Sequence, residues 1–428
     1  MKNNNALSIS LYSALANGIK MIAGPITLLF ISRNLNSEQI SFYYTFFSFV
    51  AMQQLAELGL GHTLKQYISH AYKLENHNWV EESKSKIKAY ILFGFKWFFF
   101  VAIFMILVVG PIGWYYYSDY TGNVIWLFPW ISLVIVSALV TALIPVQILI
   151  EATQNQKIVY QAQSVSALIN SVSIWALLTL DFSLYTISLA LIISNIFFYS
   201  FLWRYAKSLY DKLSIISVTS KAITVFKELW PLLSRVSIVW GVGFLFWNGF
   251  NLISFKIYGA DYAGKVIFTI ALARAGFGLA DSLFSSQITA ISYKIAQGQV
   301  QQAKEYAKKY QKFSITVLLL GYFTFCVLAN ILSDFFLFQK IVDMEYTISI
   351  FLFFTATLLL TTQNNFIRCF KVEPFVYVSV IQGGAIPLAF YLSNSGSHSF
   401  YFYPCALIMV GSIVASRIIS TRFLVNRS

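Results

Sequence analysis

The sequence predicts an all-α, polytopic membrane protein with about twelve transmembrane helices. Hydrophobic residues make up 58% of the 428-residue chain and charged residues only 11%, whereas soluble proteins average about 25% charged residues. The apolar residues gather in runs of about 20, the length that a helix needs to cross a bilayer. No run shows the alternation of a membrane barrel strand. Because unpaired backbone groups are too costly in lipid, helices are expected throughout.

Twelve apolar runs define the expected spans. They lie, to within several residues, at 7–31, 39–61, 89–113, 123–150, 161–180, 184–206, 230–255, 262–290, 313–334, 343–367, 375–392 and 399–424. We expect two six-helix lobes, residues 1–206 and 230–428. A basic, amphipathic segment over 207–229 is expected to join them on the inner membrane surface.

The Lys and Arg residues indicate how the spans are oriented. Most of the 30 fall at the chain ends and in the loops after even-numbered spans, while the other loops hold only Arg33, Lys256, Lys265 and Lys340. Cytoplasmic loops carry the excess of basic residues, so both termini are expected in the cytoplasm. The net charge of +13 is then explained by membrane orientation, and we expect no nucleic-acid partner.

Polar residues recur at helical spacing inside the first two spans. Asn17 and Lys20 belong to one polar face of the first span, and Gln53 and Glu57 share a face of the second. A charge at membrane depth costs roughly 2.5 to 3.5 kcal/mol even on the mildest scale. These faces should therefore line a hydrated cavity or contact other helices.

The same pattern returns in spans seven and eight. Span seven carries Asn248 on its polar face, with Arg235 beside that face near the inner end. In span eight Arg274, Gly278, Asp281 and Ser285 follow at spacings of four, three and four. They therefore form one small, polar stripe among larger apolar residues.

The two halves of the chain show a faint internal repeat. Residues 47–73 can be laid on 268–294 without gaps, which matches Gln53 to Arg274. The outer loops after spans one and seven, ISRNLNSEQISFYY and SFKIYGADYAGK, are also similar. Both halves run in the same direction. Parallel repeats of this kind are typical of alternating-access carriers.

Lys20 and Arg274 are the main candidates for binding an anionic substrate, because they lie near the midpoints of their spans. Arg235, closer to the interface, is either a third basic ligand or a residue that reaches the headgroups. Two buried ion pairs are the alternatives, Arg274 with Asp281 and Lys20 with Glu57. Glu57 and Asp281 could instead act as ion-coupling sites if desolvation raises their pKa.

Other chemistry is poorly supported by the sequence. No phosphate-cradling loop, metalloprotease helix or nucleophile elbow is present, so we expect no catalytic residues, no cofactor and no enzyme. Three cysteines and the widely spaced His62, His70 and His77 do not suggest a metal site. A membrane polymerase or ligase for lipid-linked sugars stays open, although the short outer loops leave little room for a catalytic surface.

Three motifs resemble a known family. They are RNLNSEQISFYY after the first span, ELGLGHTLKQYIS at the exit of the second, and EATQNQKIVYQAQ between the fourth and fifth. Together with the twelve spans they resemble the Wzx-type O-antigen flippases. That family is the polysaccharide-transporter branch of the multidrug/oligosaccharidyl-lipid/polysaccharide (MOP) exporter superfamily, which also contains the MATE transporters.

The resemblance implies a MATE-like, V-shaped, bilobed protein of the bacterial inner membrane. Its substrate would be an undecaprenyl-pyrophosphate-linked oligosaccharide, passed on to an O-antigen polymerase and its chain-length regulator. Related flippases place basic residues in the first and eighth helices, which matches Lys20 and Arg274; where many have another base in the second helix, this chain has Gln53 and Glu57. A cation-coupled multidrug exporter of the same superfamily is the alternative within this fold.

Overall fold

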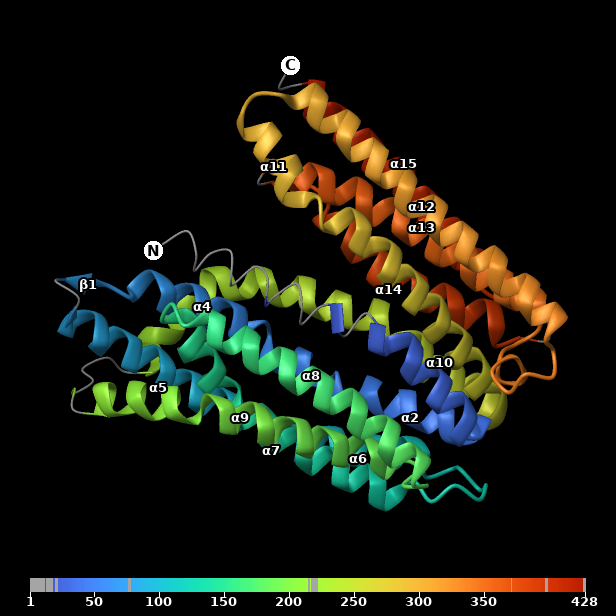
Figure 1. Ribbon diagram of the computed structural model, residues 1–428, viewed down its shortest axis with the longest axis horizontal. Helices are drawn as coiled ribbons and strands as arrows, with labels where there is room; N and C mark the ends of the chain where they lie inside the picture. The colour runs from blue at the N-terminus through green and yellow to red at the C-terminus, as the bar shows by residue number, and fades with distance from the viewer. Residues whose placement is uncertain are drawn as a thin grey trace. The chain divides into compact units, whose positions relative to one another are not determined.

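The computed structural model describes residues 12, 18–19, 22–75, 78–214, 216, 222–370, 372–396 and 399–425. In this part of the chain the only strands are the two-residue β1 (Leu74–Glu75) and β2 (Asn78–Trp79), which pair antiparallel. The rest of the regular structure is helical (Figure 1). The predicted all-α class is therefore confirmed.

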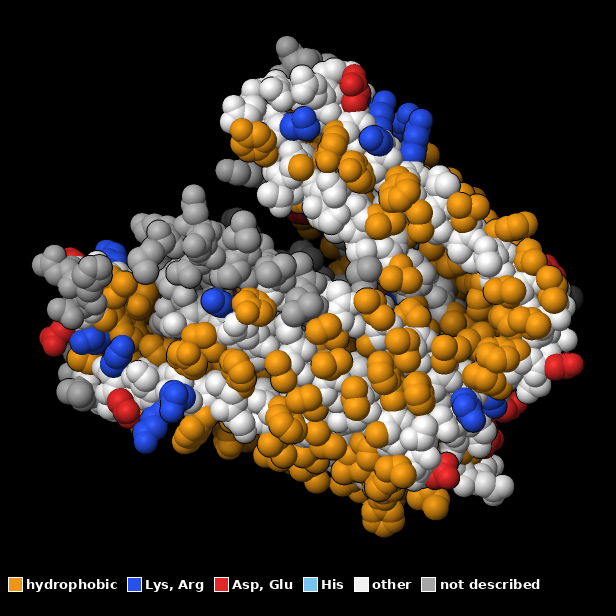
Figure 2. Space-filling model, in the orientation of Figure 1, with side chains coloured by type: hydrophobic (Ala, Val, Ile, Leu, Met, Phe, Trp, Pro, Cys, Tyr) orange, Lys and Arg blue, Asp and Glu red, His pale blue; other side chains and the backbone are white. Residues whose placement is uncertain are grey.

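Nine helical segments of the described chain are long and apolar enough to cross a membrane. They are Glu81–Tyr117, Leu127–Ala152, Gln156–Thr179, Tyr185–Ser214, Val236–Ala296, Val300–Ile331, Met344–Arg368, Val376–Asn394 and Tyr403–Leu424. Figure 2 shows hydrophobic side chains over much of the visible helix sides, as expected of surfaces that face lipid. A multi-pass membrane protein is thus supported, while the number twelve and the cytoplasmic termini stay predictions.

The segment Val236–Ala296 combines the predicted spans seven and eight. It contains most of α10 (Ala222–Ser285), in which only Gly259 has non-helical backbone angles, with φ 73° and ψ 172°. A positive φ of this kind suits glycine, which has no Cβ to clash. The expected outer loop SFKIYGADYAGK is therefore helical on both sides of a break at Gly259.

The second predicted span is not one uninterrupted helix. After α2 (Ser37–Val50) come α3 (Gln53–Glu57) and α4 (Leu60–Ala71), and the break between them places Leu58 and Gly59 in the left-handed region. Glycine tolerates that region, whereas Leu58 adopts it at some steric cost because of its Cβ. The prediction of one helix over 39–61 is corrected here.

Contacts divide the chain into two compact units. The first comprises Met1–Phe30 and Thr45–Gly241, and the second comprises Ile31–Tyr44 and Val242–Ser428. These boundaries differ from the predicted lobes, 1–206 and 230–428, and from the predicted linker over 207–229. Residues 207–214 of that linker extend the sixth predicted span, and residues 222–229 begin α10. The functional division at 206 and 230 stays a prediction.

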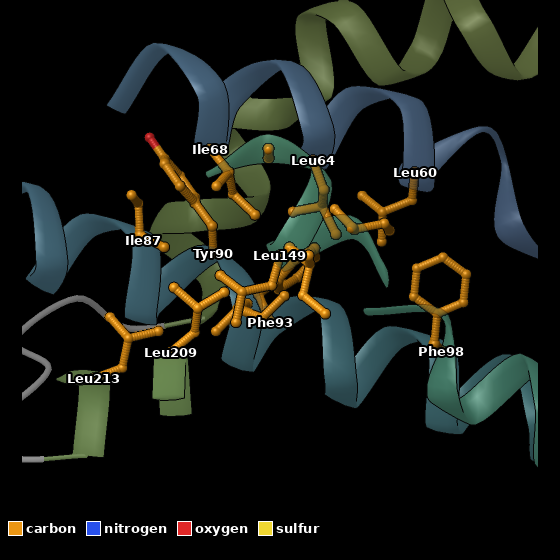
Figure 3. Close-up of a cluster of buried hydrophobic side chains, with 14 of the residues drawn as sticks. Leu60, Leu64, Ile68, Ile87, Tyr90, Phe93, Phe98, Leu149, Leu209 and Leu213 are labelled. Atoms are coloured by element: carbon orange, nitrogen blue, oxygen red, sulfur yellow. The ribbon is translucent and has the colours of Figure 1, made fainter. Parts of the chain in front are cut away.

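The first unit is built around the long helices that follow α4. These are α5 (Glu81–Phe104), the π-helix η1 (Met105–Val109), α6 (Gly110–Tyr117), α7 (Leu127–Ala152), α8 (Gln156–Thr179) and α9 (Tyr185–Ser214). Helix α8 packs on α9, and α7 contacts α4, α5 and α9. Leu60, Leu64, Phe98 and Leu149 lie in the resulting buried cluster (Figure 3).

The second unit holds residues 242–285 of α10 and the helices that follow it. These are α11 (Ile288–Ala296), α12 (Val300–Ile331), the short η2 (Phe338–Lys340), α13 (Met344–Arg368), α14 (Val376–Asn394) and α15 (Tyr403–Val425). Helix α13 packs against both α12 and α15. The core is rich in aromatic rings, among them Phe250, Phe353, Phe390 and Phe402.

Within the second unit, Gly264 of α10 lies against the start of α2. A Cβ added at Gly264 would lie 1.8 Å from the carbonyl oxygen of Ser37, so the backbone would have to move. Gly264→Ala should therefore lower the free energy of unfolding by about 2 kcal/mol, the cost typical of overpacking. Thermal unfolding of the purified protein in detergent measures the loss.

The matched control is Gly278→Ala on the same helix. Within the described structure, a Cβ at Gly278 would have no neighbour within 4 Å. If both variants lower the free energy of unfolding equally, the close approach of Gly264 to Ser37 is not the cause of the loss.

Candidate functional site

Some of the predicted site residues cannot be placed. Asn17 and Lys20 lie outside the described residues. Arg235 belongs to α10, but its side chain is not described. Their assignment to substrate binding stays a prediction, as does the alternative ion pair between Lys20 and Glu57.

Arg274 lies in the second half of α10 and contacts the first half of the same helix. Its Nη2 donates a hydrogen bond to the carbonyl oxygen of Trp247 at 2.5 Å. The guanidinium carbon lies 5.2 Å from the centroid of the Trp247 ring, within the range of a cation–π interaction. The guanidinium is thus held in place by an indole ring and a carbonyl oxygen of Trp247.

The Arg274 side chain keeps unused donors. Its Nε is buried and has no hydrogen-bond partner among the described residues, and no described carboxylate lies within ion-pair distance. The alternative ion pair between Arg274 and Asp281 is therefore not formed. Seven residues separate the two, which is about 10 Å along a helix. The structure offers a half-buried cation with a buried Nε and no anionic partner in the described chain.

Asp281 follows Arg274 along the predicted polar stripe. Its Oδ2 accepts a hydrogen bond from Ser285 Oγ at 3.2 Å, while Oδ1 is buried without a partner in the described chain. Between them Gly278 is exposed. The stripe therefore carries the cation of Arg274, the exposed Gly278 without a side chain, and the Asp281 carboxylate with one unpartnered oxygen among the described residues.

Asn248 is adjacent to the Arg274 contact. Its Nδ2 donates to the Phe244 carbonyl one turn earlier at 3.2 Å, and the side chain is half-buried. Asn248 therefore directly follows the residue that Arg274 contacts, and its own side chain bonds to the preceding turn. The sequence analysis missed Trp247, although this residue directly precedes Asn248.

Gln53 and Glu57 lie four residues apart on α3 in the first unit, and both are half-buried. Glu57 Oε1 accepts a hydrogen bond from the backbone N–H of Gly61, at the start of α4, at 3.2 Å. A carboxylate at this position satisfies a free amide and favours the helix start. Glu57 therefore has a structural role at the break, and its role in ion coupling stays a prediction.

One partly buried ion pair joins two of the motifs that carry the family resemblance. Lys65 of ELGLGHTLKQYIS contacts Glu151 of EATQNQKIVYQAQ through its Nζ. The side chain of Glu151 is only 9% exposed, and that of Lys65 is 37% exposed. Next to this pair, Ser69 Oγ donates to the Ala152 carbonyl at 3.3 Å. These contacts give the two motifs a shared structural role within the first unit.

Metal chemistry receives no support from the described residues. Among them, no three His, Cys, Asp or Glu side chains come together in a way that could hold a metal ion. The described cysteines, Cys326, Cys369 and Cys405, are all free.

Comparison with known proteins gives a class for this fold. No known family profile matches the sequence, and no curated protein matches it. Solved structures do match over nearly the whole chain. An inward-facing multidrug resistance MATE family transporter of the MOP superfamily is 13% identical with a TM-score of 0.65, covering 97% of this chain and 94% of that one.

Two further structures agree with this match. A MATE protein in complex with MaL6 is 10% identical with a TM-score of 0.57, covering 99% and 96% of the two chains. A MOP superfamily transporter from Pyrococcus furiosus, described as having a binding pocket of reverse polarity, is 10% identical with a TM-score of 0.55, covering 97% and 93%. The chain therefore has a multi-pass transporter fold. More particularly, it has the fold of the MATE transporters of the MOP superfamily.

Proposed function

We propose that this protein is a flippase for lipid-linked oligosaccharide. It moves undecaprenyl-pyrophosphate-linked O-antigen repeat units from the cytoplasmic to the periplasmic leaflet of the bacterial inner membrane by alternating access. The observation that carries the proposal is Arg274, a cation inside a span with a buried, unpartnered Nε and no described anionic partner. Such a residue suits a substrate that brings its own negative charge.

The pyrophosphate is the part of the substrate that Arg274 would bind. A guanidinium presents several N–H donors in a planar fork, which fits two phosphate oxygens at once. Trp247 already fixes the plane of the guanidinium, so less conformational entropy is lost on binding. Removing the pair from water strengthens its attraction, since electrostatic interactions grow as the local dielectric constant falls.

The other predicted residues take supporting roles in this proposal. Lys20 and Arg235 add positive charge for the pyrophosphate, and Asn17, Gln53 and Asn248 offer hydrogen bonds to the polar head. Asp281, with its free Oδ1, and Glu57 are the candidates for proton or sodium coupling. The bound head must favour one conformational state over the other, because a ligand shifts an equilibrium only by its differential affinity.

A cation-coupled multidrug exporter is the second candidate. One matching structure is described as a multidrug resistance MATE family transporter, and the free Oδ1 of Asp281 could bind a cation. Against it stands Arg274 on the same helix face, which would repel a cationic drug. The reverse polarity described for the Pyrococcus furiosus transporter is a precedent for other cargo in this fold.

Deleting the gene in its native strain tests the proposal. We expect single undecaprenyl-linked repeat units to accumulate on the cytoplasmic face, and a plasmid copy of the gene to restore surface polysaccharide. Single units that reach the periplasm and are ligated without polymerisation would indicate a polymerase. Normal polysaccharide with increased drug sensitivity would indicate a multidrug exporter.

A further inference from the structure

A groove in the second unit lies apart from the candidate substrate residues. Its volume is about 880 Å³, within the range of about 300 to 1,000 Å³ of small-molecule sites. It is lined mainly by α12, α13 and α15, while α10, α11 and Phe370 contribute single residues. Arg274, Asn248 and Asp281 are not in its lining. We call it the basic groove.

The charged residues of the basic groove are all positive. Lys304 and Lys308 lie four residues apart on α12, and Arg417 extends from α15. No Asp or Glu lines the groove. Within the described chain, none of the three cationic side-chain groups donates a hydrogen bond or forms an ion pair. Figure 2 shows Lys and Arg side chains gathered near the C-terminal end of the second unit.

The polar side chains deeper in the basic groove already have partners. Gln311 Nε2 donates to Thr362 Oγ1 at 2.9 Å, and Gln363 Nε2 donates to the Ile413 carbonyl at 3.5 Å. The cations are therefore the groups that still need a partner. Three unpaired positive charges around one concave surface favour an anionic ligand.

The rest of the lining is apolar. Leu359 and Phe366 of α13 and Ile413 and Leu424 of α15 face the groove. A small soluble anion would leave this surface without a function. A molecule with an anionic head and a hydrocarbon chain uses both parts, because burying each CH₂ is favourable by about 0.8 kcal/mol.

The position of the two lysines along α12 indicates that this ligand comes from the membrane. The helix is polar from Gln301 to Lys312 and apolar from Phe313 onward, so Lys304 and Lys308 lie less than three turns before its membrane-spanning part. Basic residues next to the cytoplasmic end of a span attract anionic lipid headgroups. From the charge distribution of the loops we expect this end of α12 to be cytoplasmic.

We propose that the basic groove binds an anionic glycerophospholipid of the inner leaflet. Lys304, Lys308 and Arg417 contact the phosphate head, and one acyl chain lies along the apolar lining residues of α13 and α15. The bound lipid fills the groove between α12 and α15 and so stabilises the second unit. This site would exist whichever cargo the protein transports.

The test uses the full-length protein, delipidated in detergent. Phosphatidylglycerol or zwitterionic phosphatidylethanolamine is added, and bound lipid is counted by native mass spectrometry. Wild-type protein should bind phosphatidylglycerol at least about ten-fold more tightly, since each basic residue near an anionic headgroup gives about a five-fold gain. The triple variant Lys304→Gln, Lys308→Gln, Arg417→Gln should lose this preference.

A second triple variant is the matched control: it removes two lysine charges and one arginine charge that lie outside the groove. Lys309→Gln, Lys312→Gln and Arg422→Gln change two exposed lysines of α12 and one exposed arginine of α15 that do not line it. This variant should keep the preference for phosphatidylglycerol. Equal loss in both variants, or no preference in wild-type protein, would overturn the proposal. Displacement of phosphatidylglycerol by undecaprenyl phosphate at equimolar concentration would assign the groove to the substrate pathway and also overturn it.

Discussion

Arg274→Ala is expected to abolish export of the lipid-linked repeat unit in a deletion strain. Removing one partner of a buried, hydrogen-bonded charge pair costs about 2 to 5 kcal/mol of binding, which is at least about 30-fold in affinity. Arg274→Lys keeps the charge but loses the planar fork and the stacking on Trp247, so it should retain only partial activity. Surface polysaccharide and trapped single repeat units measure both variants.

Arg368→Ala is the matched control for Arg274. Arg368 is exposed and bonded to Glu373, with its Nε 2.5 Å from Oε2, and exposed pairs contribute about 0 to 1 kcal/mol. It should leave export unchanged. Normal membrane insertion of Arg274→Ala with undiminished surface polysaccharide would remove Arg274 from the substrate site.

The polar stripe of α10 was predictable because it depends on local spacing alone. Arg274, Asp281 and Ser285 fall on one helix face at any helical geometry, and the Ser285–Asp281 hydrogen bond follows from a spacing of four. The partner of Arg274 was not predictable in this way. Trp247 precedes it by 27 residues, and their contact depends on the helix breaking at Gly259.

The role of Glu57 shows a second limit of sequence reasoning. The ELGLG motif was interpreted as the end of an uninterrupted span, and Glu57 was assigned to a polar face. In the structure Leu58 has a positive φ of 55°. Leucine rarely adopts this conformation, so the sequence pattern did not predict it. Glu57 therefore ends α3 and caps α4, where the pattern alone predicted a continuous helix.

Burial decides the expected effect of breaking the Lys65–Glu151 ion pair. Lys65→Ala should lower the free energy of unfolding by about 3 kcal/mol, because it leaves the carboxylate of Glu151, only 9% exposed, without its partner. Glu151→Ala should cost less, since Lys65 is 37% exposed and can still contact water. Thermal unfolding of the two single variants and the double variant gives the coupling energy of the pair.

The exposed pair Lys86–Glu82 provides the matched control for this cycle. Lys86 Nζ and Glu82 Oε1 lie 2.9 Å apart, and the two side chains are 59% and 78% exposed, so only a small coupling energy is expected, because solvent screens exposed pairs. Similar coupling in both pairs would mean that burial adds nothing to the Lys65–Glu151 contact. Larger coupling in the Lys65–Glu151 pair would instead explain why two motifs 86 residues apart in the chain carry a lysine and a glutamate at these positions, since the buried carboxylate of Glu151 needs the lysine to be tolerated in the first unit.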